Sequence, residues 1–293
     1  MYPAPIDDYL RPRTVAEAVK AIGKYKAGEA FCIAGGQSLM QAIKSRLVAP
    51  KCLIDLQDIE ELRGIAVNAK GVAIGAMTRY ADIAADERLN GAYQALIDAA
   101  SHVGDRQVRN RGTIGGSVCW NYIAACMPTV ALGLGVTLKL VSGAGKARDI
   151  GADDFFKGPL ETARRDKEIL QTINLPKAPK RAGSMYQKWG LVSDALPVIG
   201  VCACVQLDAK GACSAARIAV GGLASGPKRA KAAEQALLGK KAGDADAIAM
   251  AMSAAADEID TQSDHWADGA YRKQLIRTLG AEVVASAFAR AVV

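Results

Sequence analysis

The chain has 293 residues, of which 51% are hydrophobic and only 5% aromatic, so it can bury a mostly aliphatic core in one large or two ordinary domains. Its formal net charge of +7 is compatible with an anionic ligand, an acidic partner or solubility alone. The dispersed lysines and arginines, without a basic–aromatic stripe, argue against nucleic-acid binding. With neither an apolar run of bilayer length nor a secretory signal, we expect a cytoplasmic protein without membrane insertion.

The first glycine pair lies between a predicted strand and a predicted helix. An apolar run over 31–34 predicts a buried strand, the Gly35-Gly36 turn follows it, and Ser38 is the expected N-cap of a helix over 39–47. Backbone amides and the helix dipole at such a helix start favour phosphate. We therefore expect an anion to bind at this turn.

The rest of the first half alternates between short strands and helices. Apolar runs bounded by turn residues predict strands over 52–56, 72–76, 136–141 and 169–175. Helical spacing predicts helices over 14–26, 78–86 and 89–102, and a turn with a short helix is expected over 149–156.

A second glycine-rich stretch covers 109–117 and contains three glycines, two hydroxyls and two arginines. Consecutive N–H groups of such a turn can point at one anion, because glycine leaves the backbone uncovered. Two separate glycine stretches, about eighty positions apart, fit a diphosphate that is held from two sides.

The pattern changes after residues 176–180, where two prolines and neighbouring positive charges predict a domain boundary. Beyond it, strands are predicted over 185–188, 198–207 and 217–221, with a hairpin turn over 208–211. Helices are predicted over 228–238, 244–259 and 265–291. Strands followed by helices indicate an α+β fold.

Familiar catalytic motifs are absent from this sequence. It contains no G-x-G-x-x-G with the required context, no P-loop, no G-x-S-x-G and no H-E-x-x-H, and neither His102 nor His265 has a partner nearby in sequence. The seven cysteines form no C-x-x-C pair, which argues against a disulfide framework and a metal site. The chemistry is therefore expected to come from a cofactor.

Several stretches together resemble one family. Ile33 to Ser38 and Thr113 to Ser117, supported by 74–78, 108–112, 168–176, 221–238 and Tyr271-Arg272, are similar to the FAD-binding medium subunit of molybdenum hydroxylases, the xanthine dehydrogenase and aerobic carbon monoxide dehydrogenase family. The resemblance implies an α+β fold. An FAD-binding domain of two α+β subdomains (PCMH/VAO-like) would cover 1–176, and a three-stranded antiparallel sheet with a helical bundle would cover 177–293.

The resemblance also implies FAD, with its diphosphate between the two glycine stretches. The flavin would receive electrons from [2Fe-2S] clusters in a small iron–sulfur subunit, which a molybdopterin centre in a large subunit reduces, within a dimer of heterotrimers. The external acceptor and the substrate stay open.

The same resemblance assigns residues to the cofactor and none to catalysis or to a metal. Gly35, Gly36 and Gln37 would offer amides and Ser38 a hydroxyl, Thr113 and Gly116 would act from the other side, and Lys188 would place a cation near the ring system. Ile169 or Leu170 would pack on the flavin. The full set of expected cofactor-binding residues is Ile33, Ala34, Gly35, Gly36, Gln37, Ser38, Leu39, Val103, Gly104, Thr113, Gly115, Gly116, Ser117, Cys126, Ile169, Leu170 and Lys188.

One departure from the family concerns the flavin side. Tyr122 and Cys126 stand where the family has aspartates, which changes the polarity near the ring.

Two alternatives to the electron-transfer subunit stay open. One is a self-contained FAD-dependent oxidoreductase, which needs a base that the sequence does not offer. The other is a structural subunit that has lost FAD, against which the two intact glycine stretches argue.

Overall fold

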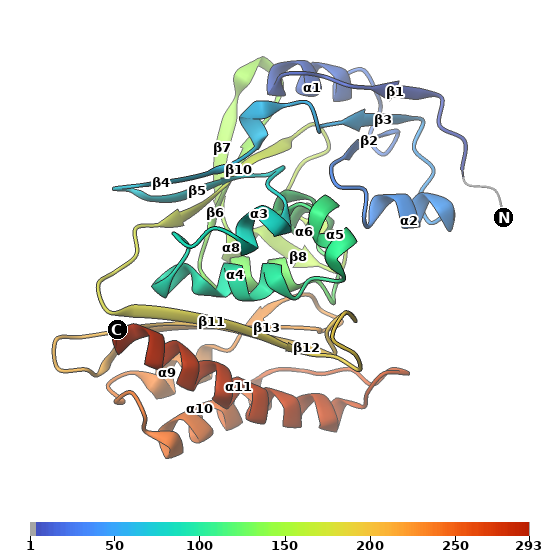
Figure 1. The fold of residues 1–293 in the computed structure, drawn as a ribbon. Coiled ribbons are helices and arrows are strands. Elements are labelled where there is room, and N and C mark those ends of the chain that lie inside the picture. The colour runs from blue at the N-terminus through green and yellow to red at the C-terminus, as the bar shows by residue number, and fades with distance from the viewer. Residues whose placement is uncertain (1–3, 293) are drawn as a thin grey trace.

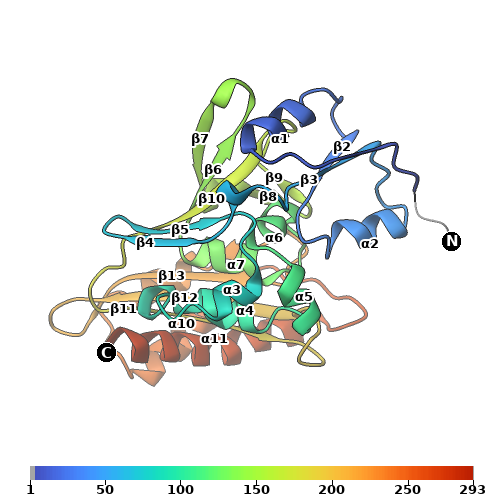
Figure 2. The same cartoon turned by 45° about the horizontal axis from the view of Figure 1, so that its top comes forward.

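The computed structural model describes residues 4–292, which form three layers around a central sheet (Figures 1 and 2). The N-terminal layer is a parallel sheet of order β1-β3-β2, covered by two helices. Thr14 caps the first of these helices by accepting a hydrogen bond from the Glu17 amide, as the sequence predicts. The elements of this layer are β1 (Asp8–Leu10), α1 (Val15–Ile22), β2 (Ala30–Ile33), α2 (Leu39–Lys44) and β3 (Cys52–Asp55).

The central layer is an antiparallel sheet of order β4-β5-β10-β6-β7. Its middle strand, β10, is the last of these five strands in sequence. It pairs with both β5 and β6 and so joins the two halves of the sheet. The strands are β4 (Ile65–Asn68), β5 (Gly71–Gly75), β6 (Thr137–Val141), β7 (Ala147–Gly151) and β10 (Ile169–Pro176). The associated helices are α3 (Tyr80–Ala84), α4 (Gln94–Ser101), α5 (Arg106–Arg111), α6 (Ile114–Trp120), α7 (Cys126–Gly133) and α8 (Ala152–Phe155), and a small hairpin pairs β8 (Phe156–Gly158) with β9 (Glu161–Thr162).

The C-terminal layer is an antiparallel sheet of order β11-β12-β13-β14. Three long strands match the expected three-stranded sheet, and β14 adds a two-residue edge strand. Three helices cover the outer face of this sheet, while α4 and α7 pack against its inner face (Figure 1). The elements are β11 (Ala182–Trp189), β12 (Ile199–Leu207), β13 (Cys213–Gly221), β14 (Lys228–Arg229), α9 (Lys231–Leu237), α10 (Ala245–Glu258) and α11 (Gly269–Val292).

Several local predictions are corrected by the structure, which also adds helix α7 and strand β1 and places strand β14 at the start of the helix predicted over 228–238. The stretch 106–120 is largely helical, because α5 and α6 meet there with only Gly112 and Thr113 between them. Residues 147–151 form strand β7 before α8, and β4 was missed, because both are edge strands with exposed residues and little apolar pattern. Ser38 occupies the N-cap position of α2, as predicted, but its side chain accepts no hydrogen bond from the helix. Within residues 4–292, no helix is both long and apolar enough to cross a membrane.

Candidate functional site

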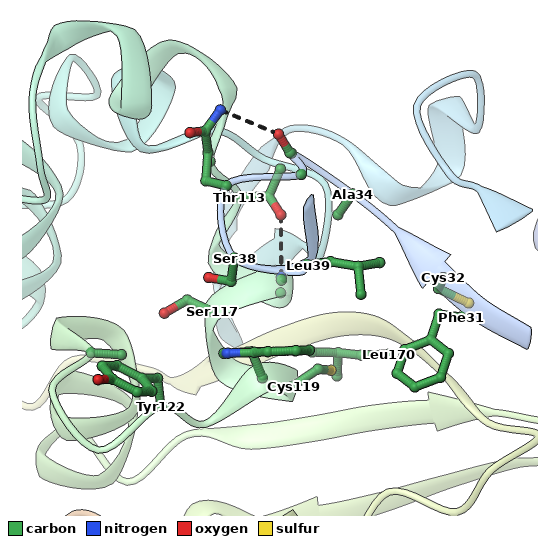
Figure 3. A pocket seen from close by; sticks show the side chains of 18 of the residues that line it. Phe31, Cys32, Ala34, Ser38, Leu39, Thr113, Ser117, Cys119, Tyr122 and Leu170 are labelled. Atoms are coloured by element: carbon green, nitrogen blue, oxygen red, sulfur yellow. Dashed lines mark hydrogen bonds between the residues drawn. The ribbon is translucent and has the colours of Figure 1, made fainter. Parts of the chain in front are cut away.

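The two glycine stretches meet at the wall of a cavity of about 740 Å³. It is lined by residues from β2, α6, β10, β11 and the loops between them. Figure 3 shows the hydroxyls of Ser38 and Ser117 entering the middle of this cavity, Tyr122 at one end, and Phe31 and Cys32 at the other. These residues mark the middle and the two ends of the cavity.

The approach of the two stretches depends on a missing side chain. A Cβ atom on Gly35 would lie 2.0 Å from the Arg111 carbonyl oxygen and 2.8 Å from the Gly112 Cα. Gly36 has a φ of +74°, which glycine adopts without strain. Any other residue at position 35 would therefore push the two halves of the wall apart.

The turn after β2 presents unused backbone donors. Among the described residues, the amides of Gly35 to Leu39 donate to no other backbone or side-chain atom, and they stand at the start of α2. Five such amides in succession, at the positive end of a helix, form a binding place for an anionic group. A diphosphate is an anion of this kind.

The second stretch contributes differently. The amides of Ile114 and Gly115 donate to the carbonyls of Thr78 (3.1 Å) and Ala76 (2.9 Å), and the Gly116 amide donates to Thr113 Oγ1 (3.1 Å; Figure 3). These bonds attach α6 to the central layer. The groups of this stretch left for a ligand are the Ser117 hydroxyl and the Thr113 amide, which donates to none of the described residues.

All of the residues expected at the cofactor line this cavity except Ile33. Successive residues of a strand face opposite sides, so Cys32 and Ala34 face the cavity while Ile33 faces away from it. Ile33 lines a separate polar cavity of about 380 Å³, together with Tyr9, Asp55 and Arg111. Strand alternation therefore accounts for the side on which the Ile33 side chain lies, and its contact with the cofactor stays a prediction.

The wall of the cavity includes the sole lysine of β11. Lys188 is half-buried, and its Nζ donates to the Ala195 carbonyl at 2.6 Å. Burial lowers the pKa of Lys188. Cys126 is buried beside Tyr186, whose hydroxyl has no hydrogen-bond partner among the described residues; burial raises the pKa of both groups.

Further residues that were not predicted from the sequence also line the cavity, among them Tyr25, Phe31, Cys32, Cys119 and Arg164. The alternation of β2 could have identified Cys32. Nothing in the local pattern distinguishes Arg164 from its neighbour Arg165, which is exposed and does not line the cavity.

The segment that carries Arg164 is held by a buried ion pair. Glu168 is buried and accepts hydrogen bonds from Nε and Nη2 of Arg148, both at 2.7 Å, and from the Arg165 amide at 2.8 Å. Arg148 also donates to the Ala163 carbonyl at 2.6 Å. These bonds connect strand β7 to both ends of 163–168 and fix the shape of the segment.

We expect Arg148→Met to destabilise the chain by about 3 kcal/mol at pH 7, because Glu168 would keep a buried charge without a partner. The hydrogen bonds of Arg148 lower the pKa of Glu168, so this contribution is present above the unfolded value of about 4.3 and is lost as the pH falls through the lower folded value. Urea denaturation at pH 7 and below pH 4 measures both effects.

Arg277→Met is the matched control, since the Arg277–Asp257 pair is exposed and its loss should cost less than about 1 kcal/mol. Equal destabilisation by the two variants would contradict the role given to the Arg148–Glu168 pair.

The fold and the cavity define an FAD-binding flavoprotein layout, and comparisons with known proteins agree. Residues 4–178 match the family described as the FAD binding domain in molybdopterin dehydrogenase, and residues 184–287 match the CO dehydrogenase flavoprotein C-terminal domain.

Two curated relatives are similar over nearly the whole chain. The glyceraldehyde dehydrogenase medium chain of Sulfolobus acidocaldarius is 32% identical, over 95% of this chain and 97% of the relative. The carbon monoxide dehydrogenase medium chain of Hydrogenophaga pseudoflava is 31% identical, over 97% of each.

Solved structures agree with the fold as well. Carbon monoxide dehydrogenase from Hydrogenophaga pseudoflava superposes with a TM-score of 0.92 at 32% identity, covering 99% of each chain. Quinoline 2-oxidoreductase from Pseudomonas putida superposes with a TM-score of 0.91 at 28% identity, covering all of each chain. The chain belongs to the family of FAD-binding medium subunits of molybdenum hydroxylases and is an oxidoreductase subunit.

Proposed function

We propose that this chain transfers electrons, through FAD, from iron–sulfur clusters of a small partner subunit to an external acceptor, while a large molybdopterin subunit oxidises the substrate. FAD supplies the ability to accept electrons from one partner and deliver them to another. The observation that carries the proposal is the row of unused amides at Gly35 to Leu39, at the wall of a cavity that Lys188 also lines.

The residues of the chain have distinct roles in this proposal. The amides of Gly35 to Leu39 bind the diphosphate, and the hydroxyls of Ser38 and Ser117 add donors from the two sides. Leu170 and its neighbours pack on the ring system and exclude water. Lys188, held by the Ala195 carbonyl, places positive charge where negative charge develops on reduction.

The cavity is also compatible in shape. Its two ends extend on either side of the diphosphate position, as a dinucleotide requires, and the missing Cβ of Gly35 leaves the wall closed around it. No observation on residues 4–292 favours the self-contained oxidoreductase or the structural subunit.

The finer expectations are part of the same proposal. We place the domain boundary between 176 and 177, which is supported by the end of β10 at Pro176 and lies two residues before the first family match ends at 178. The dimer of heterotrimers and the cytoplasmic location likewise stay predictions. Both curated relatives are named as the medium chain of a dehydrogenase, which supports an assembly with further subunits.

The test is purification of the untagged chain from its native source, followed by metal analysis and anaerobic mixing with an external acceptor. We expect iron, molybdenum and two further polypeptides to co-purify, and flavin absorbance that is bleached by substrate to return on adding the acceptor. A chain that carried flavin without metals or partner polypeptides would contradict the proposed electron route and favour the self-contained oxidoreductase.

A further inference from the structure

The end of the cavity away from Tyr122, where Phe31 and Cys32 lie (Figure 3), has a guanidinium group at its wall. Arg164 lines this end with Phe31 and Cys32 of β2 and with Cys119 of α6. Burial raises the pKa of Cys32 to about 11 and also raises that of Cys119, and the positive charge of Arg164 opposes both shifts. Arg164 is therefore near two walls of the cavity at once.

Two hydrogen bonds hold the side chain of Arg164 in place, but they use only one of its three nitrogens. Its Nη1 donates to the carbonyls of Glu168 (3.0 Å) and Arg165 (3.2 Å), which belong to the segment that the Arg148–Glu168 pair holds. Among the described residues, Arg164 forms no ion pair, and its Nε and Nη2 donate no hydrogen bond. A planar donor group with unused N–H bonds is thus fixed at the cavity wall, in a segment whose Asp166 and Lys167 also line the cavity.

The distance along β2 relates this group to the anion-binding turn. Cys32 precedes Gly35 by three residues, which is about 10 Å in a strand. Figure 3 shows Cys32 and Phe31 on the side of the cavity away from Tyr122. With a diphosphate at Gly35 to Leu39 and the ring system near Lys188, the remaining half of the dinucleotide extends toward Arg164.

We propose that Arg164 binds the AMP half of FAD and makes the site select the dinucleotide over FMN. A guanidinium plane can stack on an adenine ring and donate hydrogen bonds to its nitrogens or to ribose and phosphate oxygens. The buried Arg148–Glu168 pair does not contact the ligand in this proposal. It positions Arg164 by holding the segment 163–168 in place. This inference rests on the proposed function, because it takes the orientation of the cofactor from it.

The test compares FAD and FMN binding to the flavin-free full chain, followed by flavin fluorescence. Arg164→Met should weaken FAD binding at least 10-fold and leave FMN binding within twofold, since FMN has no AMP half. Arg164→Lys, which keeps the charge without the planar fork, should give an intermediate loss of FAD affinity. Arg165→Met is the matched control and should change neither affinity.

Several results would overturn the proposal. One is an FAD affinity of Arg164→Met within twofold of the unmodified chain. Another is an equal loss of FAD and FMN affinity, which would place Arg164 at the shared half of the two ligands or in the fold. If the Met variant unfolds, Arg164→Lys decides by the same comparison. An unmodified chain that bound neither flavin would refute the proposed function itself, and this inference with it.

Discussion

Gly35→Ala is expected to reduce FAD affinity at least 100-fold. The added Cβ would lie 2.0 Å from the Arg111 carbonyl oxygen, so the turn that presents the amides of Gly35 to Leu39 must move away from the start of α6. Both atoms in this clash belong to backbone, and Arg111 is held in α5, so the clash cannot be relieved by rotating a side chain. Calorimetric titration of the flavin-free chain with FAD measures the loss.

Gly151→Ala is the matched control for this substitution. A Cβ at Gly151 has no neighbour within 4 Å, and its φ of −70° suits alanine. This variant should bind FAD as the unmodified chain does. If Gly35→Ala also kept its FAD affinity, with the fold intact by circular dichroism, the anion-binding turn would have been assigned wrongly.

Lys188→Met is expected to lower the midpoint potential of bound FAD by about 30–60 mV. A positive charge beside the ring favours the reduced cofactor, which carries more negative charge. For a two-electron couple, about 1.4 kcal/mol of lost stabilisation corresponds to about 30 mV. A charge pair in a protein is worth a few kcal/mol at an effective dielectric constant near 20, so losing the charge of half-buried Lys188 is expected to cost about one or two steps of this size.

Lys188→Arg keeps the charge and should retain most of the potential, whereas Lys188→Met should not. Potentials are read from the flavin spectrum during reductive titration with a reference dye. An unchanged potential in Lys188→Met, with FAD still bound, would remove Lys188 from the flavin end of the cavity. The nearby Asp194, which also lines the cavity, would then become the charge to examine.

Local signals predict the elements that hold the site, but not all of its walls. The capped helix at Thr14 and the strand–glycine–helix arrangement around Gly35 were both predictable, because propensity and spacing act within a few residues. Helix α6 was missed because two glycines open it, and glycine disfavours helices. In the fold, Gly115 is required there, since a Cβ would lie 2.5 Å from the Ala76 carbonyl oxygen.

The role of Arg164 at the cavity wall could not be predicted from the sequence. Arg164 and Arg165 are adjacent residues of the same type, and no local sequence pattern distinguishes them. Only the fold shows that Arg164 lines the cavity and that Arg165 is exposed. The separation depends on Arg148 and Glu168, which are twenty positions apart in sequence and meet because β6 and β10 bring their segments together. Such a tertiary pair leaves no local pattern.

The central claim is that one FAD binds in the cavity between the two glycine stretches. The most direct measurement is a titration of the flavin-free chain with FAD, with the bound flavin released by acid and identified by chromatography. The account predicts one FAD per chain, bound in preference to FMN. A chain that stayed colourless and gave no binding heat with FAD would contradict it, and the next residues to test would be Tyr122 and Cys126, which line the cavity.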